Sequence, residues 1–106
     1  SPMRKIELEM LGAIQAHKNW QSGNTSVSVS GSESLDICVR LHGNLIAQIW
    51  PNHGILHIKD AGWQTATTKS RLNAILNCFG HPSIYQKQFK WFLKDKAFPG
   101  WAKLPI

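Results

Sequence analysis

Residues 64–72, with the sequence QTATTKSRL, place two cations at the expected start of a helix. A helix N-terminus carries a partial positive charge and unpaired backbone N–H groups, so Asp and Glu are its usual first-turn residues. Lys69 and Arg71 reverse that preference, and they become favourable if a phosphate docks on the free N–H groups. We expect an anion-binding corner made of Thr68, Lys69, Ser70 and Arg71. The alternative is an ordinary capped helix with solubilising cations, since these cost little there.

Residues 85–106 form a second candidate site, in which aromatic rings alternate with lysines. A single-stranded nucleic acid uses both, because bases stack on rings at about 1–3 kcal/mol per base and phosphates bind cations. The alternative is that the rings form the core and the lysines form its solvated rim, since a chain of this size must bury most of its large side chains. The candidates are Lys87, Lys90 and Lys94 for phosphate, and Trp91 and Trp101 for base stacking.

A third candidate site is the face of the expected sheet that points away from the core. Its side chains are Arg40, His42, Gln48, Trp50, His57 and Lys59. Such a face is similar in composition to platforms that hold unstacked bases, with Arg40 and Lys59 for phosphate and Trp50 for stacking. Asp36 on the same face weakens this interpretation, and strand register cannot be fixed from sequence.

No pattern in the chain indicates catalysis or a metal site. His53 and His57 have the spacing of helical metal ligands, but they flank an expected turn and strand, where that geometry is lost. No glycine-rich run precedes Lys69, so a phosphate-binding loop for nucleotide hydrolysis is not expected. His42, His57 and Asp60 lack a nucleophile motif beside them. We expect no cofactor and no enzyme, with a nuclease-type activity as the alternative.

The charge of the chain favours a polyanionic partner. Lys and Arg outnumber Asp and Glu by 12 to 6, which gives a net charge of +6. Residues 85–106 alone hold five of these cations and one anion. An excess of this kind is typical of proteins that bind nucleic acid, so DNA or RNA is the expected partner.

The sequence also suggests a compartment. No apolar run approaches the roughly 20 residues that cross a bilayer, so we expect no membrane association and a cytoplasmic protein. Cys38 and Cys78 lie far apart in the chain, as reduced structural thiols do. Ser1 and Pro2 precede Met3 and are interpreted as a tag remnant, so the single expected domain covers residues 3–106.

Hydrophobic periodicity predicts two helices and several short strands. The first helix covers residues 3–17, with Glu7 pointing away from its apolar stripe and Leu8 free to contact a second layer or a partner. The second helix begins with Thr67 or Thr68 as its cap and ends at Gly80. Strands are expected at residues 25–30, 35–41, 45–50 and 55–59, a strand or hairpin at 84–93, and irregular structure at 94–106.

This order, α-β-β-β-β-α-β, predicts the fold class. Consecutive strands joined by tight turns form an antiparallel meander, and a meander with one apolar face needs helices to cover it. We expect an α+β fold: a two-layer sandwich in which two helices cover one face of a four-stranded antiparallel meander.

Several segments together resemble a family of small basic accessory proteins of tailed bacteriophages, of unassigned function. The resemblance rests on Asn24-Thr25, LHGNLIA at 41–47, DAGW at 60–63, TTKSRLNA at 67–74, and YQK at 85–87 with Trp91. It implies a protein of the host cytoplasm that either handles nucleic acid or interferes with a host factor. It implies no roles for individual residues.

Two functional hypotheses follow. The first is a non-enzymatic nucleic-acid-binding protein that prefers single strands or a particular shape over a defined duplex sequence. The second is a host-takeover or anti-defence inhibitor that binds a host protein, with Leu8 and exposed tryptophans as anchors. A structural component of the virion is a third option. DNA against RNA, and monomer against homodimer, stay open.

Overall fold

The computed structural model of the protein describes residues 3–106, so Ser1 and Pro2, interpreted as a tag remnant, lie outside the described residues. Two helices and six strands form the main body, and three short strands form a second sheet. The main elements are α1 (Lys5–Ala16), β1 (Trp20–Ser22), β2 (Thr25–Ser30), β3 (Asp36–Leu41), β4 (Asn44–Trp50), β5 (Ile55–Lys59), α2 (Ala66–Cys78) and β9 (Trp101–Pro105). The smaller sheet contains β6 (Tyr85–Lys87), β7 (Lys90–Leu93) and β8 (Lys96–Ala97).

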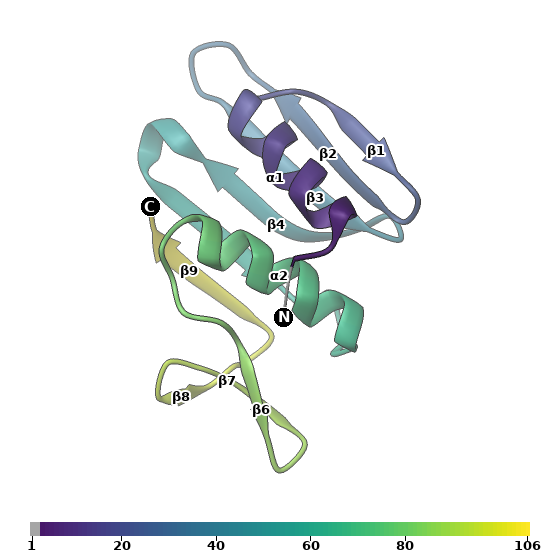
Figure 1. Cartoon of the computed structure of the whole chain (residues 1–106). Coiled ribbons are helices and arrows are strands. Elements are labelled where there is room, and N and C mark those ends of the chain that lie inside the picture. Colours follow the sequence, from purple (N-terminus) through teal and green to yellow (C-terminus); the bar gives the residue numbers. More distant parts are fainter. Residues whose placement is uncertain (1–2) are drawn as a thin grey trace.

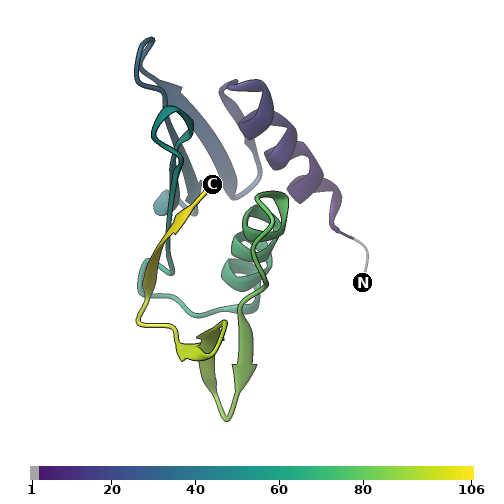
Figure 2. The same ribbon diagram turned by 90° about the vertical axis from the view of Figure 1, so that its left-hand side faces the viewer.

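The main sheet is antiparallel throughout, and its strand order is β1-β2-β3-β4-β5-β9 (Figure 1). Both helices cover the same face of this sheet, which Figure 2 shows nearly edge-on. None of the described residues forms a helix on the other face. The predicted α+β class, with helices layered on an antiparallel sheet, is confirmed.

The sheet has two more strands than the predicted meander. The prediction that residues 94–106 are irregular was wrong, because β9 lies there and pairs with β5, placing Leu104 opposite Leu56 and Ala102 opposite Ile58. Its prolines gave a false signal, since Pro99 precedes the strand and Pro105 closes it at the sheet edge, where a missing N–H is tolerated. Strand β1, also unpredicted, pairs with β2 across a short turn.

The side chains along each strand alternate between the two faces of the sheet, and those on the helix side form the core. Val39, Ile49, Leu56 and Ile58 point toward the helices and are fully buried. The β3–β4 register shifts between Val39 and Arg40, as at a β-bulge, and consecutive residues Ile46 and Ala47 are both buried near it. The helices complete this core with Met10 and Ile14 of α1 and with Leu72, Ile75 and Leu76 of α2.

Helix α2 begins at Ala66, earlier than expected. Its N-cap is Thr65, whose hydroxyl oxygen accepts a hydrogen bond from the Thr68 backbone N–H at 3.2 Å. The predicted cap at Thr67 or Thr68 was therefore wrong. Thr68 is a buried residue of the first turn, with its hydroxyl 2.9 Å from that of Thr65. This shift moves Lys69 and Arg71 out of the first turn.

A buried ion pair connects the two helices. The guanidinium of Arg71 lies 2.7 Å from the Glu7 carboxylate, and both residues are 3% exposed. The same guanidinium donates to the Thr25 hydroxyl at 3.0 Å and lies 3.4 Å from the Asn24 amide oxygen. The prediction that Glu7 points to solvent was wrong, because Arg71 and the Ser70 hydroxyl both hydrogen-bond its carboxylate inside the protein.

The predicted strand or hairpin at 84–93 is a hairpin, β6–β7, and the small sheet that it forms projects beyond one end of the main sheet (Figures 1 and 2). Ile84, Trp91, Leu93 and Phe98 anchor it to the common core. The Asn73 side chain also fixes its start by accepting from the Ile84 N–H and donating to the Ile84 carbonyl oxygen. Among residues 3–106, no helix has the length and apolar character needed to span a bilayer.

Replacing Arg71 by Met is expected to lower the free energy of unfolding by about 3–5 kcal/mol, because it leaves a buried carboxylate without its cation. The double variant Glu7→Leu/Arg71→Met should recover much of this loss, since no uncompensated charge is left. Urea denaturation measures both. Lys69→Met, on the same helix, is the matched control and should cost less than about 1 kcal/mol. Equal losses for Arg71→Met and Lys69→Met would contradict this account.

Ending the chain after Gly100 is expected to lower the free energy of unfolding by about 2–3 kcal/mol, the scale of one buried leucine. Strand β5 would lose one of its two neighbours and become the edge of the sheet, so amide exchange of Ile55–Lys59 should accelerate. Hydrogen exchange with mass spectrometry measures this. The control is Lys103→Ala, which keeps the strand and removes only an exposed side chain. Unchanged protection of β5 in the shortened chain would argue against the β5–β9 pairing.

Candidate nucleic-acid interface

The predicted anion-binding corner is largely occupied by the protein itself. Arg71 is buried in its pair with Glu7, and Ser70 donates its hydroxyl to the same carboxylate. Thr68 is buried against Thr65. These three residues have no free group to offer a phosphate at the surface, so their predicted role is wrong.

Lys69 is the exception, because its side chain turns toward the small sheet. Its ammonium nitrogen lies 3.5 Å from the amide oxygen of Gln86 in β6. The contact is with a neutral group, so the charge of Lys69 stays uncompensated. Lys69 therefore lies beside Gln86 of β6 rather than at an anion site at the helix start.

One face of the β6–β7 hairpin brings rings and cations together. Tyr85 pairs with Phe92, and their rings stack with centroids 5.6 Å apart and planes at 17°. Lys87 pairs with Lys90 in the next register position on the same face. The Tyr85 hydroxyl donates to the carbonyl oxygen of Lys94 at 2.8 Å, which places the main chain of Lys94 beside this ring pair. We call Tyr85, Lys87, Lys90, Phe92 and Lys94 the hairpin face.

Trp91 lies on the opposite side of the hairpin, paired with Gln86. It is 3% exposed and packs near Phe98, with ring centroids 6.2 Å apart. A buried ring cannot stack on a base, so the prediction for Trp91 was wrong. Alternation along β7 explains the result, because burying Trp91 and Leu93 leaves Lys90 and Phe92 on the outer side.

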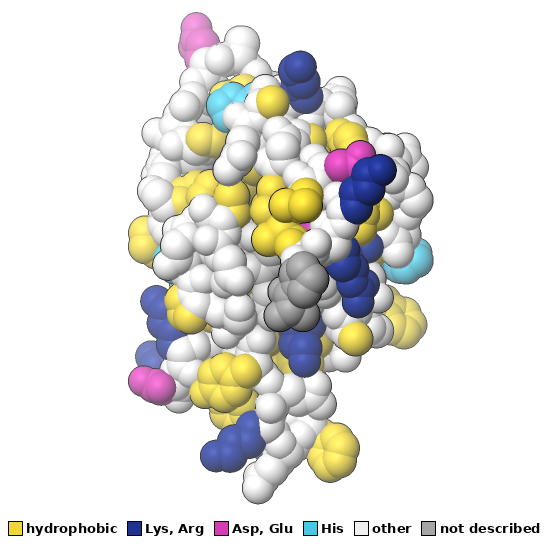
Figure 3. Space-filling view, in the orientation of Figure 1, with side chains coloured by type: hydrophobic (Ala, Val, Ile, Leu, Met, Phe, Trp, Pro, Cys, Tyr) yellow, Lys and Arg dark blue, Asp and Glu magenta, His cyan; other side chains and the backbone are white. Residues whose placement is uncertain are grey.

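The tip of the hairpin holds the most exposed large hydrophobic side chain of residues 3–106. Phe89 is 93% exposed, and it shares a two-residue turn with Gln88. Both residues have positive φ, 51° and 66°, in a turn that normally uses Asn and Gly. Such a conformation costs about 1–2 kcal/mol for each non-glycine residue. The side chains near the tip include both hydrophobic and cationic groups (Figure 3).

On the outer face of the main sheet, several polar side chains predicted to be available for binding hydrogen-bond one another instead. Arg40 donates to the Ser28 hydroxyl at 3.1 Å, and Gln48 donates to the Asp36 carboxylate at 3.0 Å. Trp50 is only partly exposed, and His42 lies in the β3–β4 turn instead of on this face. The predicted platform is therefore reduced at its centre, where its polar groups bind one another.

Free cations collect at the β5–β9 edge of this face. Lys103 pairs with His57, and Lys59 pairs with Trp101. The Trp101 ring meets the His57 ring edge-on, with centroids 5.9 Å apart at 89°. Lys59 and Trp101 were predicted, but Lys103 was missed because its segment was interpreted as irregular. The alternation of Trp101, Lys103 and Pro105 on one side of β9 is the signal that could have revealed it.

Two groups on the outer face have displaced pKa values. Burial lowers the pKa of His57 below its usual 6.5, and the positive charges of Lys59 and Lys103 lower it further. Burial raises the pKa of the Cys38 thiol, and the neighbouring Asp36 carboxylate adds to this. At neutral pH the imidazole is therefore uncharged and the thiol keeps its proton. Within residues 3–106, no three His, Cys, Asp or Glu side chains gather as metal ligands would.

These features define a small basic α+β protein that presents exposed aromatic and cationic side chains on a projecting hairpin and on one sheet edge. The family model described as Kyanoviridae Gp96 protein matches residues 3–103, and the chain belongs to this phage protein family. The predicted membership of a bacteriophage family is confirmed. No curated protein and no solved structure matches the chain.

Replacing Lys103 by Gln is expected to raise the pKa of His57, because it removes one of the two cations that oppose protonation. NMR titration of the imidazole measures this, with Lys18→Gln, at the end of α1, as a charge-matched control. In the wild type the folded pKa lies below the unfolded value. The unfolded state therefore binds the proton first, and the stability that neutral His57 provides is present above pH 6.5 and is lost as the pH falls below it. An unshifted His57 pKa in Lys103→Gln would contradict the conclusion that the charge of Lys103 lowers it.

Proposed function

We propose that this protein is a non-enzymatic nucleic-acid-binding protein that acts in the host cytoplasm and holds single strands on the hairpin face. The observation that carries the proposal is the placement of the stacked Tyr85–Phe92 pair beside the Lys87–Lys90 pair on one exposed face. Two residues along a strand cover about 7 Å, so one nucleotide can reach both a ring and a cation. Unstacked bases and bare phosphates are what this face can bind.

The charges on the hairpin support a polyanionic partner. Lys87 and Lys90 lie directly opposite each other, and like charges in that position destabilise a strand pair. The single ion pair among residues 3–106 is the buried one between Arg71 and Glu7, so no carboxylate of these residues neutralises the two lysines. A phosphate between them would relieve the repulsion, and Lys94, whose carbonyl oxygen accepts from the Tyr85 hydroxyl, adds a third lysine to this face.

A preference for single strands follows from the rings. A base must leave its own stack before it can lie on Phe92 or Tyr85, and this costs least in a strand that is not paired. Phe89 adds a ring at the tip that contacts nothing large in the protein, as its exposure shows. Sequence selectivity would then be weak, because every base has a flat face.

The double variant Lys87→Glu/Lys90→Glu is expected to weaken binding to labelled single-stranded DNA or RNA by at least about tenfold, since two phosphate contacts become repulsive. The slope of log affinity against log salt should fall by about 1–2. Fluorescence anisotropy at about 50 and 200 mM salt measures both, the range over which phosphate contacts respond.

The matched control is Lys5→Glu/Lys18→Glu, which changes the net charge equally at two exposed lysines near the two ends of α1. It should keep most of the affinity. If both double variants lose affinity to the same extent, binding depends on net charge and not on the hairpin face. If the wild type binds no strand at the lower salt, the proposal fails.

A host-protein inhibitor is the second candidate, and the exposure of Leu8 favours it. Leu8 is 58% exposed on α1, on the opposite side from the helix stripe that contacts the core. An apolar side chain there is the kind of anchor that a protein partner buries. A pull-down from nuclease-treated bacterial lysate separates the candidates: a protein retained by the wild type and lost in Leu8→Asp supports the inhibitor.

A further inference from the structure

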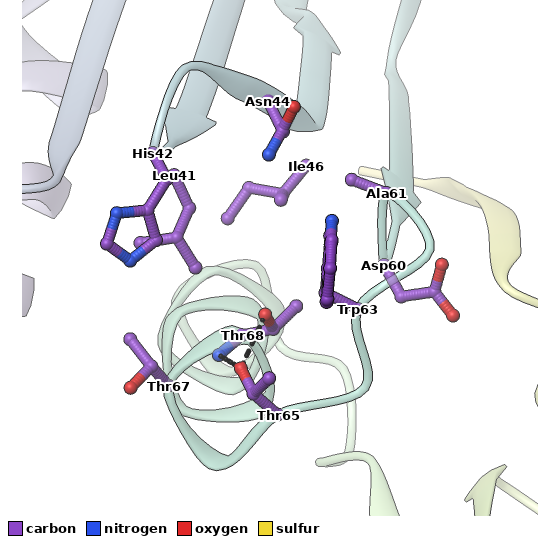
Figure 4. Close-up of a pocket in the computed structure, with 10 residues that line it drawn as sticks. All are labelled: Leu41, His42, Asn44, Ile46, Asp60, Ala61, Trp63, Thr65, Thr67 and Thr68. Atoms are coloured by element: carbon purple, nitrogen blue, oxygen red, sulfur yellow. Dashed lines mark hydrogen bonds between the residues drawn. The ribbon is translucent and has the colours of Figure 1, made fainter.

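A hollow of about 430 Å³ lies where the β3–β4 turn, the segment after β5 and the start of α2 meet (Figure 4). It is distinct from the hairpin face, and none of its lining residues belongs to the small sheet. Its volume falls within the range of small-molecule sites, about 300–1,000 Å³. Its lining residues are Leu41, His42, Asn44, Ile46, Asp60, Ala61, Trp63, Thr65, Thr67 and Thr68.

One wall of the hollow is the ring of Trp63. The residue is 64% exposed, although tryptophan side chains are usually mostly buried. In Figure 4 the ring is seen edge-on, and one flat face looks across the hollow toward Leu41 and His42. Leu41 and Ile46 supply a buried apolar floor. A space bounded by a flat ring and an apolar floor suits a flat ring as its occupant.

The polar groups of the hollow lie at its edges. Figure 4 places the Asn44 side chain on one side of the space and Thr65 and Thr67 on the other. A primary amide offers a donor and an acceptor side by side, which matches the hydrogen-bonding edge of a heterocycle. No lysine or arginine lines the hollow. The Asp60 carboxylate points away and already accepts from the Gly62 N–H and the Gln64 amide. The hollow therefore favours an uncharged ligand over a phosphate.

The backbone around the hollow is held by the fold before any ligand arrives. The His42 backbone N–H donates to the Asn24 carbonyl oxygen at 2.7 Å, and the Trp63 backbone N–H donates to the Asp60 carbonyl oxygen at 3.0 Å. The Thr65 cap fixes the start of α2. Binding would therefore cost little ordering of the loops.

We propose that this hollow binds one nucleobase, stacked on Trp63 and hydrogen-bonded at its edge by Asn44. A nucleobase is flat, uncharged and lined with donors and acceptors, which are the three properties that the hollow selects. The base can belong to a free nucleoside or to an unstacked position of a strand. The inference goes beyond the hairpin and does not depend on it.

The first test uses free nucleosides, which have no phosphate for the lysines. Adenosine, guanosine, cytidine and uridine are titrated separately into the labelled protein, with ribose as the control ligand. At least one nucleoside should produce saturable NMR shifts of the Trp63 indole N–H and the Asn44 side-chain amide, and ribose should produce none. Absence of saturable shifts at millimolar concentrations of all four nucleosides would overturn the proposal.

Two variants test the assigned contacts. Trp63→Ala should weaken nucleoside binding by about tenfold or more, the scale of one lost stacking contact. The control Met3→Ala removes another exposed apolar side chain outside the hollow and should leave nucleoside binding unchanged. Asn44→Ala should weaken binding several-fold, as one lost hydrogen bond does. Wild-type affinity in either Trp63→Ala or Asn44→Ala would overturn the assignment.

Oligonucleotides distinguish the two possible sources of the base, a nucleic-acid strand and a free nucleoside. If the base comes from a strand, Trp63→Ala should also weaken single-stranded DNA binding, and its effect should vanish on an oligonucleotide of abasic sites. If the ligand is a free nucleoside, Trp63→Ala should leave strand binding unchanged while nucleoside binding is lost. Both results support the base site. A loss of strand binding in Trp63→Ala that is equally large on the abasic oligonucleotide would count against it.

Discussion

The buried pair of Arg71 and Glu7 is the interaction on which the arrangement of the protein depends. It joins α1 to α2, and through Thr25 and Asn24 it joins both helices to the start of β2. Two charges buried this deeply are tolerated only when each has its partners, so the helices cannot slide or rotate without exposing an unmatched charge to the core. The pair also determines which cations face the surface. With Arg71 committed inward and Ser70 bound to the same carboxylate, α2 contributes only Lys69 to the positive charge of the surface.

Much of the fold could be predicted from sequence because burial of one sheet face leaves a clear signature. The alternation of Ile37, Val39 and Leu41 located β3 almost to the residue. Three predictions failed for physical reasons. Glu7 has the identity of a surface residue, and only its distant partner makes burial tolerable. The prolines near β9 indicated a break because a sequence does not show which strands will lie at an edge. The start of α2 was misplaced because Thr65, Thr67 and Thr68 can all cap a helix, and the extended backbone at Thr65 decides between them.

The candidate sites also have parts that the sequence predicted and parts that only the structure revealed. Composition alone located the cluster of rings and cations after Tyr85, but the division of that cluster between core and surface required register. Trp91 and Phe92 are adjacent in sequence and have opposite fates, one buried and the other stacked on Tyr85. The hollow beside Trp63 had a weaker signal, a large aromatic ring within a segment interpreted only as a chain break. Its other walls come from the β3–β4 turn and from α2, so no local pattern could have assembled it.

The position of β9 at the end of the chain and at the edge of the main sheet has a consequence for the order of folding. Strands β1 to β5 are sequence neighbours joined by short turns, so their pairing closes small loops and can occur early. The second neighbour of β5, β9, is separated from it by residues 60–100, so this pairing closes a much longer loop and is expected to form later. Until then the β5 edge exposes open backbone groups beside Leu56 and Ile58, a template for pairing with another chain. The stage of folding most prone to aggregation is therefore the interval before this last strand docks, and whatever hastens its docking protects the yield of native protein.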